Sequence, residues 1–334
     1  MIKKVTIIGT GAYGTVLANV LTDNGIDVIM YGIEQSQVDD INENHKNSAF
    51  FNNKNINSTI KATTDLAAAL ENTELLILSV PTFAISTTLD KVIKIAKNKM
   101  IILNVAKGLD GEHLDVLSKY IIAKFSKHEN IFMGYAGLYG PSVAIEVLER
   151  KPTCINAASN DINIAKQVAA VFSNEYFGVF PTTNLIGTEI AAAVKNTIAI
   201  ASGLIHGLNN GSDNTKASLI TMGLIEMMNL AVAYGASEKD LVNYASVGDL
   251  ILTATSPKTR NFRLGMKIAA ADDAKSVLEG YKITVEGVLT CKIAYEMVKK
   301  VKISAPLIEI MFKVLYNNDK PSNSMNNLFR SLGI

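Results

Sequence analysis

Cysteine and histidine are scarce in this chain, and their spacing excludes two kinds of site. The only cysteines, Cys154 and Cys291, lie far apart and form no C-x-x-C pair. Such sparse use argues against a disulfide scaffold and fits a reducing cytoplasm. The four histidines are scattered, so we expect no zinc site and no other metal centre.

Charge of one sign and long apolar runs are also missing. The formal net charge is +1, with no basic stripe, so we expect no nucleic-acid partner. No uninterrupted apolar run of about 18 residues occurs, so no transmembrane helix is predicted. The apolar run 5–8 ends at Gly9 and is too short for the core of a signal peptide. We therefore expect a cytoplasmic protein without membrane insertion.

The pattern of the chain changes once, and the change indicates two domains. The length of 334 residues suits about two domains, and 48% hydrophobic residues provide ample core. Strand-like and helix-like segments alternate as far as Thr183, and the rest reads almost entirely as helix. We expect an α/β domain with a parallel sheet in residues 1–184 and an all-helical domain in residues 185–334.

A glycine motif stands at the start of the first domain. Gly9, Gly11 and Gly14 form G-x-G-x-x-G between an apolar strand (4–8) and a helix (15–24), with the next strand at 27–31. Alone this pattern is weak, but strand, glycine loop, helix and strand within about thirty residues are typical of a dinucleotide site. The glycines allow a tight turn and close approach of the pyrophosphate, whose charge the helix N-terminus stabilises.

Two further segments follow predicted strands of the first domain. Lys107 comes directly after the apolar strand 100–105, and the glycine- and proline-rich loop 137–142 follows the strand 130–135. The carboxyl ends of parallel strands border the ligand crevice in this kind of sheet. Lys107 is therefore a candidate for ligand binding, although a solvated lysine at a strand end is an equally simple interpretation.

The helix predicted for residues 189–205 carries a lysine in apolar surroundings. It is rich in alanine, has Thr188 as a candidate N-cap, and is apolar on nearly every face, so it should be buried. A buried ammonium at Lys195 needs hydrogen-bond partners or a shifted pKa. The simpler alternative is that the long side chain reaches solvent at a helix edge.

Three polar clusters mark the rest of the second domain. Asp249 lies beside glycine among apolar residues, and Arg260 and Arg263 share a face if their segment is helical. Glu286 lies near the start of the last predicted site helix, together with Thr284. Its simplest role is to compensate the helix dipole.

Taken together, these motifs resemble those of the soluble NAD(P)-dependent glycerol-3-phosphate dehydrogenases. The resemblance covers nearly the whole chain, and the order and spacing of its motifs are specific. They are 9–17, 106–109, 140–142 with Ala144 and Glu146, 195–196, 211–215 with 219–221, 248–250, 259–261 and 285–288.

The resemblance implies a Rossmann-type first domain, a helical second domain, a homodimer and specific residue roles. Lys195 is the implied general acid/base, with Asp249 and Thr253 around it and Lys107 beside the substrate. Arg260 and Asn261 are implied to bind the substrate phosphate. The full set of predicted substrate contacts is Lys107, Gly140, Ser142, Lys195, Asn196, Asp249, Thr259, Arg260 and Asn261. The predicted cofactor contacts are Gly9, Gly11, Ala12, Tyr13, Gly14, Glu34, Lys107, Ala144, Arg260 and Glu286.

The chemistry of the residues agrees with this activity. Reduction of a ketone needs a hydride donor, a proton donor and positive charge near the developing alkoxide. Desolvation should lower the pKa of Lys195, Lys107 should lower it further, and Asp249 should oppose both. A substrate phosphate calls for a bidentate donor such as Arg260. We therefore expect dihydroxyacetone phosphate to be reduced to glycerol 3-phosphate for phospholipid synthesis.

Five positions depart from the family pattern. Alanines 191–192 replace two usual glycines, Tyr139 replaces a small residue, and Met222 stands where arginine is usual. Ile33 occupies the usual place of a basic residue near the adenosine ribose, and Glu34 follows it. These last two residues disfavour the 2′-phosphate of NADP, but the cofactor is left as NAD or NADP.

Two alternatives remain open. One is a related two-domain dehydrogenase that acts on another small phosphorylated or acidic substrate. The other is a non-catalytic NAD(P)-binding redox sensor. Arg260 with Asn261 argues against the first, and intact Lys195, Asp249 and Lys107 argue against the second.

Overall fold

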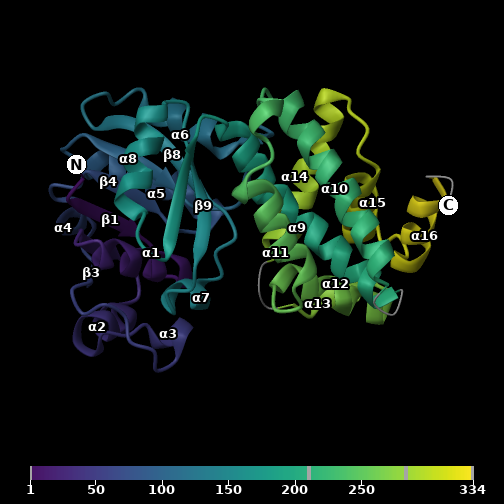
Figure 1. The fold of residues 1–334 in the computed structure, drawn as a ribbon, viewed down its shortest axis with the longest axis horizontal. Helices are drawn as coiled ribbons and strands as arrows, with labels where there is room; N and C mark the ends of the chain where they lie inside the picture. Colours follow the sequence, from purple (N-terminus) through teal and green to yellow (C-terminus); the bar gives the residue numbers. More distant parts are fainter. Residues whose placement is uncertain (1, 209–211, 282–284, 332–334) are drawn as a thin grey trace. The chain divides into compact units, whose positions relative to one another are not determined.

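A computed structural model describes residues 2–208, 212–281 and 285–331 of the chain. It divides into unit 1, Met1–Ala106 with Ser118–Leu185, and unit 2, Lys107–Leu117 with Ile186–Ile334. The expected classes, a Rossmann-type domain followed by a helical domain, are confirmed (Figure 1). The domain limits 1–184 and 185–334 stay a prediction. Gly211, which begins one of the motifs, and Thr284, named together with Glu286, lie outside the described residues.

Unit 1 is built on an eight-stranded sheet in the order β10-β9-β8-β5-β4-β1-β2-β3. All neighbouring strands are parallel except β8 and β9. The part β3-β2-β1-β4-β5-β8 has the strand order of a dinucleotide-binding sheet. The strands are β1 (Lys4–Ile8), β2 (Asp27–Tyr31), β3 (Lys61–Thr63), β4 (Leu75–Leu78), β5 (Met100–Asn104), β8 (Phe132–Tyr139), β9 (Thr153–Ala158) and β10 (Phe177–Thr182).

The central strands of this sheet are apolar because both of their faces are covered. All four residues of β4 and all five of β5 are buried. Helices α1 and α8 pack against each other and against the sheet. The helices of unit 1 are α1 (Ala12–Asp23), α2 (Gln35–Asn44), α3 (Ser48–Phe51), α4 (Leu66–Leu70), the short η1 (Thr82–Ala84), α5 (Ile85–Ile95), α6 (Leu117–Phe125), α7 (Ala144–Leu148) and α8 (Ile162–Phe172).

The described residues of unit 2 form helices and one small hairpin of β6 (Leu109–Asp110) and β7 (Asp115–Val116). Its longest helix, α9, is buried along most of its length, and a single apolar core surrounds it. The helices are α9 (Leu185–Leu208), α10 (Asp213–Ala233), η2 (Glu238–Asp240), the π-helical turn η3 (Tyr244–Gly248), α11 (Asp249–Thr255), α12 (Arg260–Ala271), α13 (Ala274–Glu279), α14 (Glu286–Val301), α15 (Pro306–Tyr316) and α16 (Pro321–Ser331).

Helix α9 begins earlier than the sequence indicates. It starts at Leu185, so Thr188 is fully buried inside the helix and is not its N-cap. Leu185 and Ile190 are both buried, and the apolar packing of this first turn extends the helix beyond the limit that capping chemistry alone suggests.

Two helices are long and apolar enough to cross a membrane by length and composition. In the most apolar 18-residue stretch of α9, 89% of the residues are buried within the protein, which is typical of a core helix. In α10 the corresponding share is 33%, so much of its apolar surface is left uncovered by the chain itself. The expectation of no transmembrane helix rested on uninterrupted apolar runs, whereas both of these helices carry polar residues between their apolar ones.

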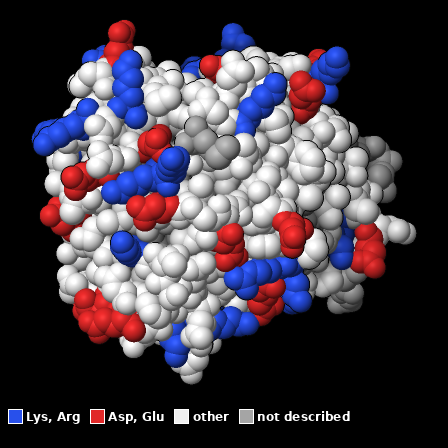
Figure 2. Space-filling view, turned by 60° about the vertical axis from the view of Figure 1, so that its left-hand side comes forward, with Lys and Arg blue, Asp and Glu red and all other residues white. Residues whose placement is uncertain are grey.

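Charged side chains on the face shown in Figure 2 are mixed in sign. Lysine and arginine side chains alternate there with aspartate and glutamate, and uncharged surface lies between them. This arrangement agrees with the small net charge of the chain.

Candidate active site

The glycine loop of unit 1 leads from β1 directly into α1. Gly9 follows the strand with a φ of +115°, a left-handed conformation that favours glycine. A Cβ atom on Gly9 would also lie 2.3 Å from the carbonyl oxygen of Ser79. The tight turn after β1 therefore requires a residue without a side chain.

The first turn of α1, which Ala12, Tyr13 and Gly14 form, is open toward a ligand. Gly11 is its N-cap, with no side-chain cap and no acidic residue in the first turn. A Cβ atom on Gly11 would meet no other atom within 4 Å. The positive end of the helix dipole therefore faces space that a pyrophosphate can fill. A dinucleotide fits this cradle.

Side chains from the segment after β2 brace the glycine loop. The hydroxyl of Thr10 donates to Gln37 Oε1 at 2.6 Å. Asn47 Nδ2 donates to the Thr10 carbonyl at 2.8 Å and to Thr15 Oγ1 at 2.9 Å. Because Gln37 belongs to α2 and Asn47 precedes α3, these bonds connect the loop to the region that follows β2.

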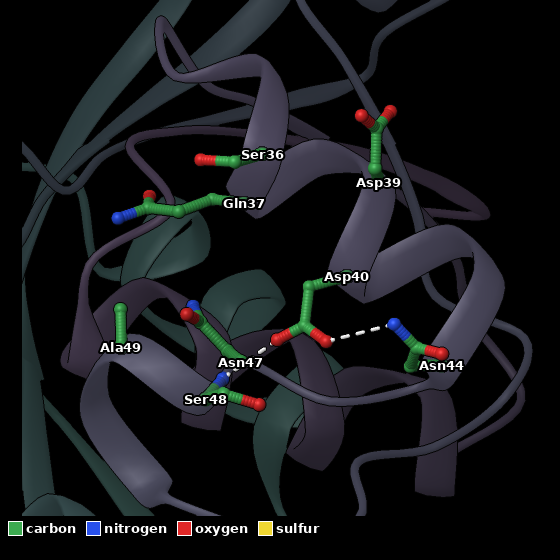
Figure 3. Close-up of a pocket in the computed structure, with 8 residues that line it drawn as sticks. All are labelled: Ser36, Gln37, Asp39, Asp40, Asn44, Asn47, Ser48 and Ala49. Atoms are coloured by element: carbon green, nitrogen blue, oxygen red, sulfur yellow. Dashed lines mark hydrogen bonds between the residues drawn. The ribbon is translucent and has the colours of Figure 1, made fainter.

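A pocket of about 470 Å³ lies beside α2 and α3 (Figure 3). In it Asp40 accepts the amide of Ser48 at 2.8 Å and Asn44 Nδ2 at 3.1 Å. The hydrogen bond from the Ser48 amide is the main reason that the pKa of Asp40 lies below its usual range, so the pocket carries negative charge. Its lining residues are Ser36, Gln37, Asp39, Asp40, Asn44, Asn47, Ser48 and Ala49.

The end of β2 exposes the two residues that bear on the choice of cofactor. Ile33 is 79% exposed, and Glu34 is an exposed N-cap of α2 whose side chain makes no cap hydrogen bond. Both side chains are accessible to a bound nucleotide. A contact between Glu34 and the ribose stays a prediction.

The loop after β8 lies close to α1. Ser142 Oγ donates to the Tyr13 hydroxyl at 3.0 Å and to the Gly140 carbonyl at 3.2 Å. Ala144 begins α7 two residues later. The structure therefore joins the predicted residues of this loop to the first turn of the glycine-loop helix. Tyr139, the departure from the family pattern, is buried under the loop.

In unit 2, Lys195 is buried on α9 and makes three polar contacts. Its side chain is 4% exposed. Nζ donates to Thr253 Oγ1 at 2.8 Å and to Asn196 Oδ1 at 3.3 Å, and it lies 3.2 Å from Asp249 Oδ1. The Thr253 hydroxyl gives its own proton to the Asp249 carbonyl at 2.7 Å, so its oxygen is free to accept from the lysine. The lysine thus stays buried and does not reach solvent at a helix edge.

Asp249 connects Lys195 to the second lysine of the site. Lys107 Nζ lies 2.7 Å from Asp249 Oδ2, and the Asp249 side chain is 2% exposed whereas that of Lys107 is 20% exposed. Asp249 starts α11, immediately after the π-helical turn η3. One carboxylate therefore holds two ammonium groups, one on each oxygen.

The environment of Lys195 brings its pKa toward neutrality. Burial lowers the pKa to about 8, the negative charge of Asp249 opposes the shift, and the positive charge of Lys107 adds to it. A lysine with such a pKa is partly protonated near neutral pH and can both donate and accept a proton.

The Asn196 side chain joins α9 to α12. Its Oδ1 accepts Asn261 Nδ2 at 2.9 Å as well as Lys195. Asn261 Oδ1 is buried and has no hydrogen-bond partner among the described residues. A buried acceptor without a partner is costly, so this oxygen suits a ligand that brings a hydroxyl or amide donor.

The start of α12 places an arginine near a half-buried carboxylate, that of Glu286. Thr259, the N-cap, donates its hydroxyl to the Thr253 carbonyl at 2.9 Å, and Arg260 follows as an exposed residue. Burial raises the pKa of Glu286, whereas the charges of Arg260 and the two site lysines oppose that shift. Arg260 and Glu286 therefore belong to the same electrostatic environment as Lys195.

Two contacts of this site were not predicted from the sequence. Thr197 Oγ1 donates to the Gly287 carbonyl at 3.0 Å. A Cβ atom on Gly287 would lie 2.6 Å from Asn261 Oδ1 and 2.7 Å from the Asn196 carbonyl. Glycine at the start of α14 thus allows close approach to α9. The sequence does show Thr197 as a polar residue in an apolar helix, but its partner Gly287 lies ninety residues away in the chain.

The predicted residues therefore form two groups, one in each unit. Unit 1 holds the glycine loop, Glu34, Gly140, Ser142 and Ala144, and unit 2 holds the rest. Met222 lies on α10 and packs against the core of unit 2, without any functional contact that the structure assigns. Among the described residues, no group of three or more metal-ligating side chains comes together.

Comparison with known proteins gives matches over nearly the whole chain. The family model described as NAD-dependent glycerol-3-phosphate dehydrogenase N-terminus matches residues 4–165. The model described as the C-terminus of the same family matches residues 184–326.

Individual relatives agree with the family models. A glycerol-3-phosphate dehydrogenase (NAD(P)+) of Mesoplasma florum is 54% identical, covering 99% of this chain and 98% of the relative. One of Staphylococcus epidermidis is 35% identical over 98% and 97% of the two chains. The crystal structure of glycerol-3-phosphate dehydrogenase from Coxiella burnetii superimposes with a TM-score of 0.89 at 30% identity, covering 98% of both chains.

Proposed function

Since the chain belongs to the family of NAD-dependent glycerol-3-phosphate dehydrogenases, we propose that it transfers hydride between NAD(P)H and dihydroxyacetone phosphate. The product, sn-glycerol 3-phosphate, supplies phospholipid synthesis. The observation that carries the assignment is the buried Lys195, bonded to Thr253 and paired with Asp249. A proton donor in a dry, polar setting is what reduction of a ketone requires of the protein.

Unit 1 binds the cofactor in this proposal. The open first turn of α1 receives the pyrophosphate, with Gly11, Ala12 and Tyr13 at the contact. The nicotinamide, when bound, supplies the hydride. Ala144, Glu286, Arg260 and Lys107 are further proposed cofactor contacts.

Unit 2 supplies the proton. In the reduction direction the Lys195 ammonium donates to the developing alkoxide and becomes neutral. Thr253 and Asp249 orient Nζ, because they occupy fixed positions on α11. Lys107 adds a second positive charge where negative charge develops on the substrate.

The substrate phosphate binds at the start of α12. Arg260 offers a planar pair of donors. The first-turn amides after Thr259 form the positive end of the helix dipole, which favours an anion. The Asn261 Oδ1 acceptor suits a substrate hydroxyl. Gly140 and Ser142 of unit 1 are also proposed to contact the substrate.

A simple assay tests the proposed function. Addition of dihydroxyacetone phosphate to the protein with NADH or NADPH should consume the reduced cofactor, measured as loss of absorbance. Unphosphorylated dihydroxyacetone should be a much poorer substrate, because Arg260 then has no partner. Equal rates with the two compounds favour the alternative of a related dehydrogenase with another substrate. Cofactor binding without turnover of any small ketone favours the redox sensor.

We also propose a homodimer in the cytoplasm. Its support is α10, which is apolar yet only one-third buried in its most apolar window, with Ile225 on it 55% exposed. A second copy of the chain can cover this surface. Light scattering should give twice the chain mass, and Ile225→Glu should lower it. The cytoplasmic location rests on the sparse cysteines and on relatives that are bacterial enzymes.

A further inference from the structure

The hairpin that carries Lys107 toward Asp249 is held by unit 2 through its apolar side chains. Leu109 and Val116 pair across the two strands, and both are almost fully buried in the core of unit 2. Lys107 precedes β6 by two residues. The seating of this short hairpin therefore determines where the ammonium of Lys107 lies.

The turn of the hairpin is fixed by hydrogen bonds to its carbonyl groups. Tyr234, which follows α10, donates its hydroxyl to the Leu114 carbonyl at 2.9 Å. Lys300 Nζ of α14 donates to the His113 carbonyl at 3.2 Å and to the Leu114 carbonyl at 3.4 Å. Leu114 has a φ of +53°, an unfavourable conformation for a residue with a side chain. Bonds from the Glu112 and His113 amides to Asp110 Oδ1 within the turn, and donors from outside it, hold this conformation.

We propose that Tyr234 is a positioning residue for the reaction: its bond to the Leu114 carbonyl seats the hairpin and thereby fixes Lys107 on Asp249. This inference rests on the proposed function, in which Lys107 and Lys195 share the Asp249 carboxylate. Tyr234 bonds to the backbone of the hairpin, and Lys107 of the same segment pairs with Asp249, so we assign its effect to the placement of Lys107.

The chemistry of the contact suits a permanent anchor. Burial, with the charge of Asp115, raises the pKa of Tyr234 to about 12, so the phenol stays a donor over the whole working range of pH. If the hairpin loosens, Lys107 withdraws from Asp249. The carboxylate then acts on Lys195 alone and a nearby positive charge is lost. Both changes raise the pKa of Lys195, because Asp249 raises it and Lys107 lowers it.

The test is a double-mutant cycle with a pH profile. Tyr234→Phe removes the donor and keeps the ring. We expect kcat/KM for dihydroxyacetone phosphate to fall by roughly 3- to 10-fold, because a displaced charge weakens transition-state stabilisation. The basic limb of the pH profile should move to higher pH. Lys107→Met should produce the same shift, and adding Tyr234→Phe to Lys107→Met should change neither kcat/KM nor the limb.

Tyr316→Phe is the matched control. Tyr316 also donates to a backbone carbonyl of unit 2, that of Val288 at 2.8 Å, but it does not touch the hairpin. It should leave the basic limb where the wild type has it, and thermal melting of all variants reports their stability. Lys300→Met, which removes the second anchor, should shift the limb in the same direction as Tyr234→Phe.

The outcomes separate the two proposals. Additive effects of Tyr234→Phe and Lys107→Met, or an unmoved basic limb in Tyr234→Phe, overturn the positioning role while the proposed function stands. A wild type that does not oxidise NADH with dihydroxyacetone phosphate overturns the function and this inference with it.

Discussion

Unit 1 offers its proposed ligand mainly backbone, whereas unit 2 offers side chains drawn from several elements. The cradle at Gly9 and Gly11 consists of one turn and the first amides of α1, all within a few consecutive residues. The cluster at Lys195 brings together α9, Lys107 ahead of β6, and α11. The first site is local in the sequence, and the second exists only after unit 2 has folded.

This difference separates two tasks. A backbone cradle recognises the shared phosphate portion of dinucleotides, since amides and a helix dipole bind anions of many kinds. A side-chain cluster can tune a proton donor, because neighbouring charges set its pKa. Changes in unit 1 should therefore alter cofactor affinity, and changes in unit 2 should alter turnover.

The largest effect should come from Lys195→Met. Loss of the general acid should reduce kcat by ~10²–10⁴-fold, while the dissociation constant of NADH stays unchanged. Stopped-flow kinetics and NADH fluorescence measure the two quantities. Lys292→Met, at an exposed lysine of α14, is the control and should keep full activity. Retention of half the wild-type kcat by Lys195→Met would remove Lys195 from its role.

Gly11→Val should have the opposite pattern. A Cβ atom at this position meets no other atom within 4 Å, so we expect the fold to melt as the wild type does. The new side chain occupies the space assigned to the pyrophosphate, so NADH should bind roughly 10-fold more weakly or worse. Calorimetric titration with NADH measures this. Wild-type affinity in the variant would show that the phosphates bind elsewhere.

The sequence predicted the unit 1 cradle almost completely, because every determinant lies within one strand–loop–helix segment. For unit 2 the sequence indicated Lys195 as an unusual lysine in an apolar helix. Its partners Asp249 and Thr253 were implied only by the family resemblance. Nothing local indicates that Asp249 joins two lysines, or that Thr197 meets Gly287 ninety residues away. The start of α9 was predicted wrongly for the same reason, since packing and not capping chemistry extends it.

Arg260→Ala should have an intermediate effect confined to the phosphate. Preference for dihydroxyacetone phosphate over dihydroxyacetone, as the ratio of kcat/KM values, should shrink by roughly 10- to 100-fold. Arg263→Ala is the matched control, one turn along the same helix and also exposed. It should keep the wild-type ratio. An unchanged ratio in Arg260→Ala would mean that the phosphate is bound by other groups.

The smallest effect concerns the choice of cofactor. Exposed Ile33 and Glu34 stand at the end of β2, and neither can pair with a 2′-phosphate. Lys46 follows later in the same segment, and its positive charge acts on Asp40 of the acidic pocket. NADH should therefore serve at least as well as NADPH, and Ile33→Arg with Glu34→Ser should shift the preference toward NADPH by roughly 10-fold. A tenfold wild-type preference for NADPH, measured as kcat/KM, would contradict this.

The pH dependence of the wild type in both reaction directions tests the central claim most directly, because one lysine serves both. Reduction needs the Lys195 ammonium, so kcat/KM for dihydroxyacetone phosphate should fall as the pH rises through the pKa of about 8. Oxidation of glycerol 3-phosphate needs the neutral amine, so its kcat/KM should rise through the same pH. Mirror-image limbs that cross near this value are the predicted result. Profiles that are flat from pH 7 to about 9, or that change in the same sense in both directions, would contradict a proton shared through Lys195.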